Sequence, residues 1–414
     1  MPMHEFDGQY YLDGPASDPH ELGWMRGAPP PVNKRITFEG GTFRDFPQIR
    51  WSFSHMRELI PTMNVWRGRG TPSQFQRNDM SAALDALIFA DMHGQSRRFD
   101  DALVDTYTDG LLVLYRGKII YERYFGALEP HLPHECQSCT KSYTGTVAAV
   151  LVHEGVLDDT RTISYYLPEL RGTAWDDATL RQVLDMQVGL AHSENYTGDD
   201  SDLWAYRWAF GRLPRPASYD GPRSSCDYLR TVRKQGVHGE FAYQSLNTQV
   251  LAWVMMRVTD CTLAQLLHER LWAPLGCEED GYLEVDPVGM PLADGGLSTT
   301  LRDFARFGEL MRCEGAWHGR QLIPASVVHD VCKGIDTAKY HNMPLPGYTY
   351  RSMWWVTNNE LGAFEGRGIH GQRLYIAPNA EMVIARFASH PVASGAGDPI
   401  LLPQMLALGR NLRA

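Results

Sequence analysis

The residues best suited to chemistry are Ser138 and Lys141, in the sequence Ser138-Cys-Thr-Lys141. Three residues apart on a helix, their side chains share a face, so the lysine amine can reach the serine hydroxyl. A serine hydroxyl is a weak nucleophile and needs a base beside it. An amine serves as that base only if burial or a neighbouring cation lowers its pKa. S-x-x-K also recurs by chance, and an N-cap serine followed by an exposed lysine is the alternative interpretation.

Tyr243 is the next candidate, in Gly239-Glu-Phe-Ala-Tyr243-Gln-Ser245, directly before an apolar run at 250–256 that predicts a helix. A loop at the start of a helix is a common position for a functional side chain. A tyrosine beside a serine–lysine pair can relay the proton from the nucleophile to the leaving group. The structural alternative is a buried aromatic ring, with Ser245 or Asn247 as the N-cap of the helix.

Glycines at 366, 368 and 371 match G-x-G-x-x-G, the pattern of dinucleotide-binding loops. Such a loop must follow a strand and open a helix, whereas this one leads into a β-rich run at 373–376. We therefore reject the dinucleotide interpretation. Glycines on an edge strand instead allow a substrate to lie against the backbone, where an N–H can stabilise an oxyanion.

The elements that must position these residues are strands near both ends of the chain and helices between them. Four β-rich runs predict two hairpins, 111–115 with 118–124 across Arg116-Gly117, and 372–376 with 382–387 across Pro378-Asn379. Helices are predicted at 79–90, at 141–154 behind the S-x-x-K pair, and at 401–412.

This pattern predicts an α/β (α+β) fold, in which an antiparallel sheet formed from both chain ends is flanked by helices. A mostly helical subdomain is expected as an insertion at about 160–290, interrupted by Pro- and Gly-rich loops at 198–223 that would shape selectivity. Residues 1–75 are rich in Pro, Gly and charge and predict an N-terminal arm packed on one domain at 76–414.

The composition excludes several classes of protein. With 414 residues, 43% of them hydrophobic and 21% charged, the chain is typical of globular proteins. A formal charge of −10 argues against a nucleic-acid partner, which requires clustered positive charge. The longest apolar run, 250–256, is far shorter than the ~20 residues that span a bilayer, so no membrane partner is expected. The first residues show no basic and apolar segments of a secretory signal.

Seven scattered cysteines make a disulfide framework improbable and indicate a reducing cytoplasm. Cys136 and Cys139 form a CxxC, but the second ligand pair that zinc requires is missing, so both thiols are interpreted as packing residues and no metal is expected.

The S-x-x-K pair, the Tyr-x-Ser motif and the glycine-rich strand, in that order and spacing, resemble the superfamily of class C β-lactamases, penicillin-binding D,D-peptidases and family VIII carboxylesterases. Within it the chain most resembles the 6-aminohexanoate-dimer hydrolases, which are nylon-oligomer amidases. The similarity runs over about 106–390 in separate patches, at 107–114, 183–187, 194–196, 239–243, 247–248, 250–253, 354–355 and 368–372. The resemblance implies a β-lactamase-like serine hydrolase domain over 76–414.

The resemblance also implies roles for particular residues. Ser138 would be the acylated nucleophile, Lys141 its hydrogen-bonded activator, and Tyr243 the general acid/base shared with the leaving group. The backbone N–H groups of Ser138 and Ile369 would form the oxyanion hole, with Gln372 as the alternative donor on that strand.

Four further residues are implied as substrate-binding, namely Tyr196, Ser245, Asp294 and His370. Tyr196 corresponds to a tyrosine that lies over the substrate and assists the amide nitrogen. Asp294, in Ala293-Asp-Gly-Gly296, is equally well explained as a turn aspartate. No cofactor is implied.

Two departures from the superfamily matter. β-Lactamases and D,D-peptidases carry Lys-Thr-Gly or a close variant on the third motif, whereas this chain has Gly366-Arg367-Gly368. Their tyrosine motif is usually Tyr-x-Asn, whereas Ser245 stands here. We therefore expect a cytoplasmic serine hydrolase that acts through an acyl-enzyme on small linear amides or carboxylic esters. A β-lactamase or D,D-peptidase, and a non-catalytic binding protein of the same fold, are the alternatives, and a homodimer is left open.

Overall fold

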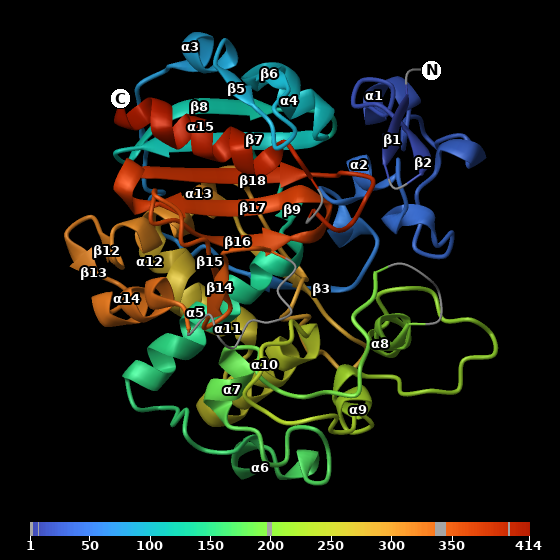
Figure 1. Cartoon of the computed structure of the whole chain (residues 1–414). Coiled ribbons are helices and arrows are strands. Elements are labelled where there is room, and N and C mark those ends of the chain that lie inside the picture. The colour runs from blue at the N-terminus through green and yellow to red at the C-terminus, as the bar shows by residue number, and fades with distance from the viewer. Residues whose placement is uncertain (1–2, 7, 197–200, 336–344, 396–397) are drawn as a thin grey trace.

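The structure is a computed structural model that describes residues 3–6, 8–196, 201–335, 345–395 and 398–414. Its central element is an eight-stranded sheet in which C-terminal strands continue into strands from the first third of the chain (Figure 1). The strand order is β14 (Thr349–Arg351), β15 (Trp354–Val356), β16 (Phe364–Gly368), β17 (Gln372–Ala377), β18 (Met382–Ala388), β7 (Thr108–Tyr115), β8 (Lys118–Tyr124) and β4 (Gln76–Arg77). All neighbours pair antiparallel except β4 and β8. The predicted antiparallel sheet built from both chain ends is confirmed.

Both predicted hairpins are present. Arg116 and Gly117 join β7 to β8 with φ angles of 51° and 72°. Two successive positive φ angles are typical of the type I′ turn, one of the two common turns of two-residue hairpins. In the second hairpin β17 pairs with β18, with Ala377 opposite Met382 at the turn. β18 then pairs with β7, so the two hairpins form the middle of the sheet.

The predicted helix at 79–90 is wrong in its second half. Only α3 (Ser81–Asp85) is helical, and the Asp79 carboxylate accepts a hydrogen bond from the Ser81 N–H at 3.0 Å. The chain then forms β5 (Ile88–Ala90), which pairs antiparallel with β6 (Ser96–Arg98). β-Branched and aromatic residues such as Ile88 and Phe89 favour a paired strand when a partner is close, and this pairing outweighs the helical pattern.

Helices cover both faces of the central sheet, because successive side chains of a strand point to opposite sides. One face packs on α5 (Thr140–His153) and α13 (Leu301–Arg312) through the strand residues Leu112, Leu114, Leu374, Ile376 and Val383. The other face packs on the C-terminal helix α15 (Leu401–Arg413) through Leu111, Val113, Tyr375, Met382 and Ile384. Figure 1 shows α15 lying across this second face. The helix predicted at 401–412 is therefore confirmed.

The helical insertion lies at the opposite end of the molecule from α15 (Figure 1). Its helices are α6 (Ile163–Tyr166), α7 (Leu180–Leu184), α8 (Asp202–Phe210), α9 (Ser225–Leu229), α10 (Ser245–Thr259) and α11 (Leu263–Leu267). The segment predicted as loops at 198–223 thus contains α8, although 197–200 lie outside the described residues. Among the described residues no single helix is long and apolar enough to cross a membrane.

A second sheet of four strands joins distant parts of the chain and is absent from the sequence-based expectations. Its order is β3 (Thr62–Val65), β10 (Gly281–Glu284), β11 (Leu297–Thr299) and β9 (His134–Glu135). β9 leads directly into the turn that holds Ser138, and β11 follows the loop that holds Asp294. This sheet therefore brings two segments of the candidate site together.

The first 75 residues pack against the rest of the chain at several points. Phe43, Trp51 and Met56 share a hydrophobic cluster with Leu213 and Tyr282. By contrast Trp66 is 45% exposed, and its ring stacks on His268 with 5.1 Å between the ring centres. The division of the chain near residue 75 stays a prediction.

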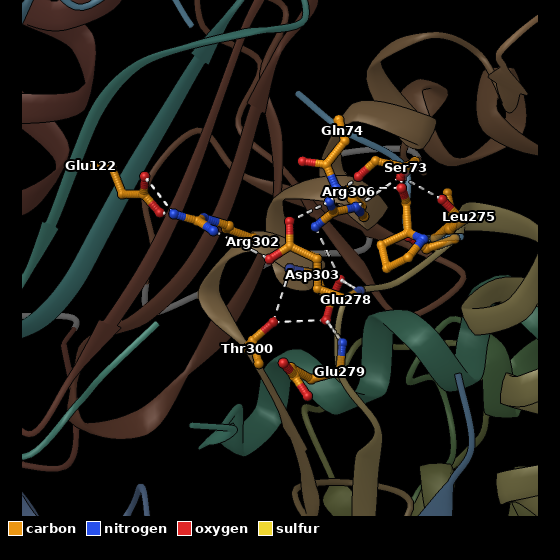
Figure 2. Close-up of polar contacts among 12 residues, drawn as sticks. Ser73, Gln74, Glu122, Leu275, Glu278, Glu279, Thr300, Arg302, Asp303 and Arg306 are labelled. Carbon is orange, nitrogen blue, oxygen red and sulfur yellow. Dashed lines mark hydrogen bonds and ion pairs between the residues drawn. The ribbon is translucent and has the colours of Figure 1, made fainter. Parts of the chain in front are cut away.

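A buried polar network fixes α13 against the neighbouring segments, as Figure 2 shows. Arg306 pairs with Asp303 at 3.1 Å and with Glu278 at 2.7 Å, and its Nε donates to the Ser73 hydroxyl at 3.0 Å. Asp303 also accepts from the Thr300 hydroxyl, which caps α13. Buried charges are stable only when paired and hydrogen-bonded in this way. The network ties the chain near residue 73 to the helix that supports the sheet.

Candidate active site

Ser138 and Lys141 lie in contact at the start of the buried helix α5. Ser138 belongs to a short 3-10 turn, Gln137–Cys139, that runs directly into α5. The Lys141 Nζ donates to the Ser138 Oγ at 2.9 Å and to the backbone carbonyl of Asp294 at 2.8 Å. Lys141 is only 1% exposed. The alternative of a capping serine and an exposed lysine is therefore excluded.

The glycines of strand β16 lie in close contact with the turn that carries Ser138. A Cβ added at Gly368 would lie 2.7 Å from the Cys136 carbonyl oxygen and 3.0 Å from the Gln137 Cβ. A Cβ at Gly366 would lie 3.1 Å from the Ser142 Oγ. β16 is an interior strand between β15 and β17, so the expectation of an edge strand is wrong. The glycines permit close approach of two backbones.

Tyr243 reaches Ser138 and Lys141 from the loop before α10. Its ring centre is 5.0 Å from the Lys141 Nζ, and the ring stacks on Trp355 at 5.3 Å. Hydrogen bonding of the phenol with Ser138 and Lys141 favours its ionised form. The three candidate catalytic side chains, which come from two distant segments, are thus brought together.

Glu194 links Tyr196 to the loop that carries Tyr243, a role that was not predicted from the sequence. Its carboxylate accepts a hydrogen bond from the Tyr196 hydroxyl at 2.7 Å. The same carboxylate accepts from the backbone N–H and the hydroxyl of Ser245. No side chain of α10 caps the helix, so the expected Ser245 or Asn247 cap is wrong, and Glu194 supplies the acceptor instead. The signal in the sequence is an acid two residues before Tyr196.

Lys141 does not rest as the neutral amine that a simple general base requires. Burial alone lowers the pKa of Lys141, but Tyr243, Asp294 and Glu194 outweigh it, and the net pKa is raised. Burial raises the pKa of Tyr243, and the cation on Lys141 opposes this only in part. At neutral pH the resting pair is therefore an ammonium and a neutral phenol. Because the two groups interact, they titrate as a pair.

Two hollows open on either side of Ser138. A cleft of about 150 Å³ is lined by Ser138, Tyr196, Tyr243, Leu345, Trp355, Arg367, Gly368, Ile369, Arg373, Ala393, Ser394 and Gly395. A narrower pocket of about 20 Å³ is lined by Ser138, Gln137, Tyr196, Leu203, Tyr206, Arg207, Phe210, Arg212, Ser245, Leu292, Asp294, Gly295 and Ile369. Ser138, Tyr196 and Ile369 border both. The larger cavity of about 630 Å³ beside β1 (Met3–Phe6) does not include Ser138.

The remaining predicted residues divide between this site and the core. Asp294 lies in a turn and also lines the narrow pocket, so its role in substrate binding stays a prediction. Ile369 lines both hollows together with Ser138, whereas the Gln372 side chain is buried and donates to the Ile369 and Ala388 carbonyls. His370 lines neither hollow; its Nδ1 donates to the His390 carbonyl at 2.7 Å and its ring packs on Phe53.

Four pocket residues come from α8, a helix that was expected to be a loop. They are Leu203, Tyr206, Arg207 and Phe210. The spacing of Leu203, Tyr206 and Phe210 is that of one face of a helix, and this spacing is the signal that could have predicted α8.

The CxxC cysteines are part of the core. Cys136 and Cys139 are both buried, and burial raises the pKa of the Cys139 thiol to about 12. Among the described residues no group of three or more His, Cys, Asp or Glu side chains is arranged to hold a metal ion.

Comparison with known proteins decides the family. The family model described as Beta-lactamase matches residues 97–402, which is most of the chain. The chain belongs to the beta-lactamase family. It is 34% identical over 356 residues to the 6-aminohexanoate-dimer hydrolase of Paenarthrobacter ureafaciens, covering 84% of this chain and 88% of that protein.

Solved structures support the same placement. A "Putative 6-aminohexanoate-dimer hydrolase from Bacillus anthracis" superposes with a TM-score of 0.84 at 31% identity, covering 90% of this chain and 96% of that one. A family VIII carboxylesterase superposes with a TM-score of 0.56 at 16% identity, covering 75% and 96%, which shows a shared fold. This member of the beta-lactamase family is thus an enzyme of the serine hydrolase class.

Proposed function

We propose that the enzyme hydrolyses small linear amides or carboxylic esters through a covalent acyl-enzyme on Ser138. The observation that carries this proposal is the buried contact between the Lys141 Nζ and the Ser138 Oγ, with the Tyr243 phenol on the same two groups and a cleft open above them. A serine activated by hydrogen-bonded neighbours can attack a carbonyl carbon and take the acyl group.

The proton of Ser138 passes to the Lys141–Tyr243 pair as the new bond forms. Since the resting pair holds an ammonium and a neutral phenol, the reactive form is the one that has lost one proton. In that form the lysine cation stabilises a phenolate, or the two groups exchange the remaining proton, and the acceptor faces the serine hydroxyl. The pair then returns the proton to the leaving alcohol or amine.

The oxyanion is stabilised by the backbone N–H groups of Ser138 and Ile369. Ile369 follows β16 directly and borders Ser138 in both hollows, which supports its choice over Gln372. Each donor of this kind contributes about 3 kcal/mol to the transition state. Water then attacks the acyl carbonyl, and the same groups release Ser138.

Tyr196 supports amide as well as ester hydrolysis in this scheme. Its hydroxyl donates to Glu194 at the border of both hollows, where it can approach the leaving nitrogen. An amine leaves only when protonated, whereas an alkoxide is a better leaving group, so amides depend more on these donors. The name of the Paenarthrobacter relative, a dimer hydrolase, is consistent with amide substrates.

Labelling with a fluorophosphonate tests the proposal, read as the mass of the intact protein. We expect one adduct on the wild type and on Ser142→Ala, a matched change one helical turn along α5, and none on Ser138→Ala. Absence of an adduct on the wild type would favour the non-catalytic binding protein. Rapid turnover of nitrocefin, faster than that of p-nitrophenyl acetate, would favour the β-lactamase alternative instead.

A further inference from the structure

Arg207 is a cation in the narrow pocket beside Ser138. It projects from α8, and it lines this pocket together with Ser138, Tyr206 and Asp294. Its guanidinium lies 5.2 Å from the ring centre of Trp204. Within the described ranges no carboxylate oxygen lies within 4 Å of it, so it has no ion-pair partner there.

The other charges around the pocket balance one another. Arg212, which lines the pocket, and Arg44 share two buried carboxylates, Glu135 and Glu284. Burial raises the pKa of Glu284 to about 7, so this cluster has no negative charge to spare for Arg207. Arg207 therefore carries a positive charge that the carboxylates of this cluster do not neutralise.

The two remaining acids near the pocket serve other groups. Asp294 lies next to Lys141, which donates to its backbone carbonyl, and the lysine cation opposes the effect of burial on the Asp294 pKa. Glu194 is occupied by Tyr196 and Ser245. Neither carboxylate forms an ion pair with Arg207, although the charge of Glu194 favours the cationic form of the guanidinium and so opposes the fall in its pKa.

The guanidinium stays charged in this position. Burial, together with the positive charges of Arg212 and Arg44, lowers the pKa of Arg207 to about 10. At neutral pH it is thus a partly desolvated cation, and such a group gains most from an anionic partner supplied by a ligand. The Tyr206 hydroxyl, which is buried with no hydrogen-bond partner among the described residues, offers a second donor in the same pocket.

We propose that Arg207 binds a carboxylate of the substrate, so that the preferred amides or esters carry a carboxylate on the part that enters the narrow pocket. This inference rests on the proposed function of Ser138. A guanidinium presents two parallel N–H groups that match the two oxygens of a carboxylate. The pocket volume of about 20 Å³ suits so small a group better than a bulky one.

Competitive inhibition of p-nitrophenyl acetate hydrolysis tests this directly, and the result does not depend on which side of the scissile bond occupies the pocket. The probes are butanoate and hexanoate, the amides butanamide and hexanamide, and the amines butylamine and hexylamine, at neutral pH. We expect a carboxylate to inhibit the wild type about tenfold more strongly than its amide, the difference typical of a charge-assisted hydrogen bond.

Variants separate Arg207 from other cations. Arg207→Gln should bring the ratio of the two inhibition constants close to one, and Arg207→Lys should retain part of the preference. Arg230→Gln changes the net charge of the protein by the same amount, but Arg230 is exposed and pairs with Asp227 outside the pocket. This control variant should keep the full ratio. The inference is overturned if carboxylate and amide inhibit the wild type equally, if Arg207→Gln keeps the ratio, or if an amine inhibits best. If the wild type neither hydrolyses the ester nor forms the fluorophosphonate adduct, the proposed function itself is refuted.

Discussion

Replacing Gly368 by alanine should disturb the oxyanion hole while leaving the enzyme folded. The added Cβ would lie 2.7 Å from the Cys136 carbonyl oxygen, 2.9 Å from the Gln372 Cβ and 3.0 Å from the Gln137 Cβ. Two of these contacts are to the turn that carries Ser138, and a carbonyl oxygen cannot rotate away as a flexible side chain can. β16 must therefore move away from that turn, and the N–H of Ile369 moves with it.

The size of the effect follows from these contacts. Overpacking of this kind costs about 1–3 kcal/mol of folding free energy, so the variant should still fold. Misplacing one oxyanion donor costs about 3 kcal/mol in the transition state, which is about a hundredfold in kcat. KM should change much less, because the ground-state carbonyl depends less on this donor.

The assay is kcat and KM for p-nitrophenyl acetate beside the thermal unfolding midpoint. Gly366→Ala is a graded comparison, because its Cβ would meet the movable Ser142 hydroxyl at 3.1 Å, and it should lose less activity. Gly70→Ala, with nothing within 4 Å of the new Cβ, should change neither quantity. A folded Gly368→Ala enzyme with kcat within about twofold of the wild type would refute the reasoning.

Three further outcomes are expected. The pKa values of Lys141 and Tyr243 are both raised, so the reactive, singly deprotonated pair becomes more abundant as the pH increases. We therefore expect kcat/KM to rise about tenfold per pH unit between about pH 6 and 9, and a flat profile would contradict this. Glu194→Gln removes a negative charge that raises the pKa of Lys141, so the rising limb should move to lower pH in the same assay, and an upward move would count against it. Asp303→Asn removes the fully buried carboxylate that pairs with Arg306 and leaves only the partly exposed Glu278. It should lower the free energy of unfolding in urea by about 3 kcal/mol, whereas a loss under about 1 kcal/mol would show that the network is dispensable.

Local patterns predicted the parts of the fold that local chemistry determines. Arg116-Gly117 predicted a hairpin because a two-residue gap with Gly at its second position suits the tight turns that join antiparallel strands, and both residues adopt positive φ. The four-stranded sheet was not predicted, because β3 and β10 pair across more than two hundred residues and their short runs carry no periodicity. The helix at 79–90 failed for the same reason, since the pairing of β5 with β6 is a tertiary choice.

The candidate site shows a similar division. Ser138 and Lys141 were recognisable because their spacing places them on one helix face, and Tyr243 because it stands in a loop before a predicted helix; the resemblance added their roles. Glu194 and Arg207 were missed because their importance lies in contacts with residues far along the chain, or in the lack of such contacts. His370 was given as substrate-binding by the resemblance, but its ring packs on Phe53 and it lines neither hollow beside Ser138.

The central claim, a covalent acyl-enzyme on Ser138, is tested most directly by trapping it. The enzyme is mixed with excess p-nitrophenyl acetate, quenched in acid within the first turnover, digested and analysed by peptide mass spectrometry. We expect a burst of one nitrophenol per active site and a single acetyl group on the peptide that contains Ser138, both absent in Ser138→Ala. Turnover without a burst and without acetylated Ser138, or an acetyl group on another residue that persists in Ser138→Ala, would contradict it.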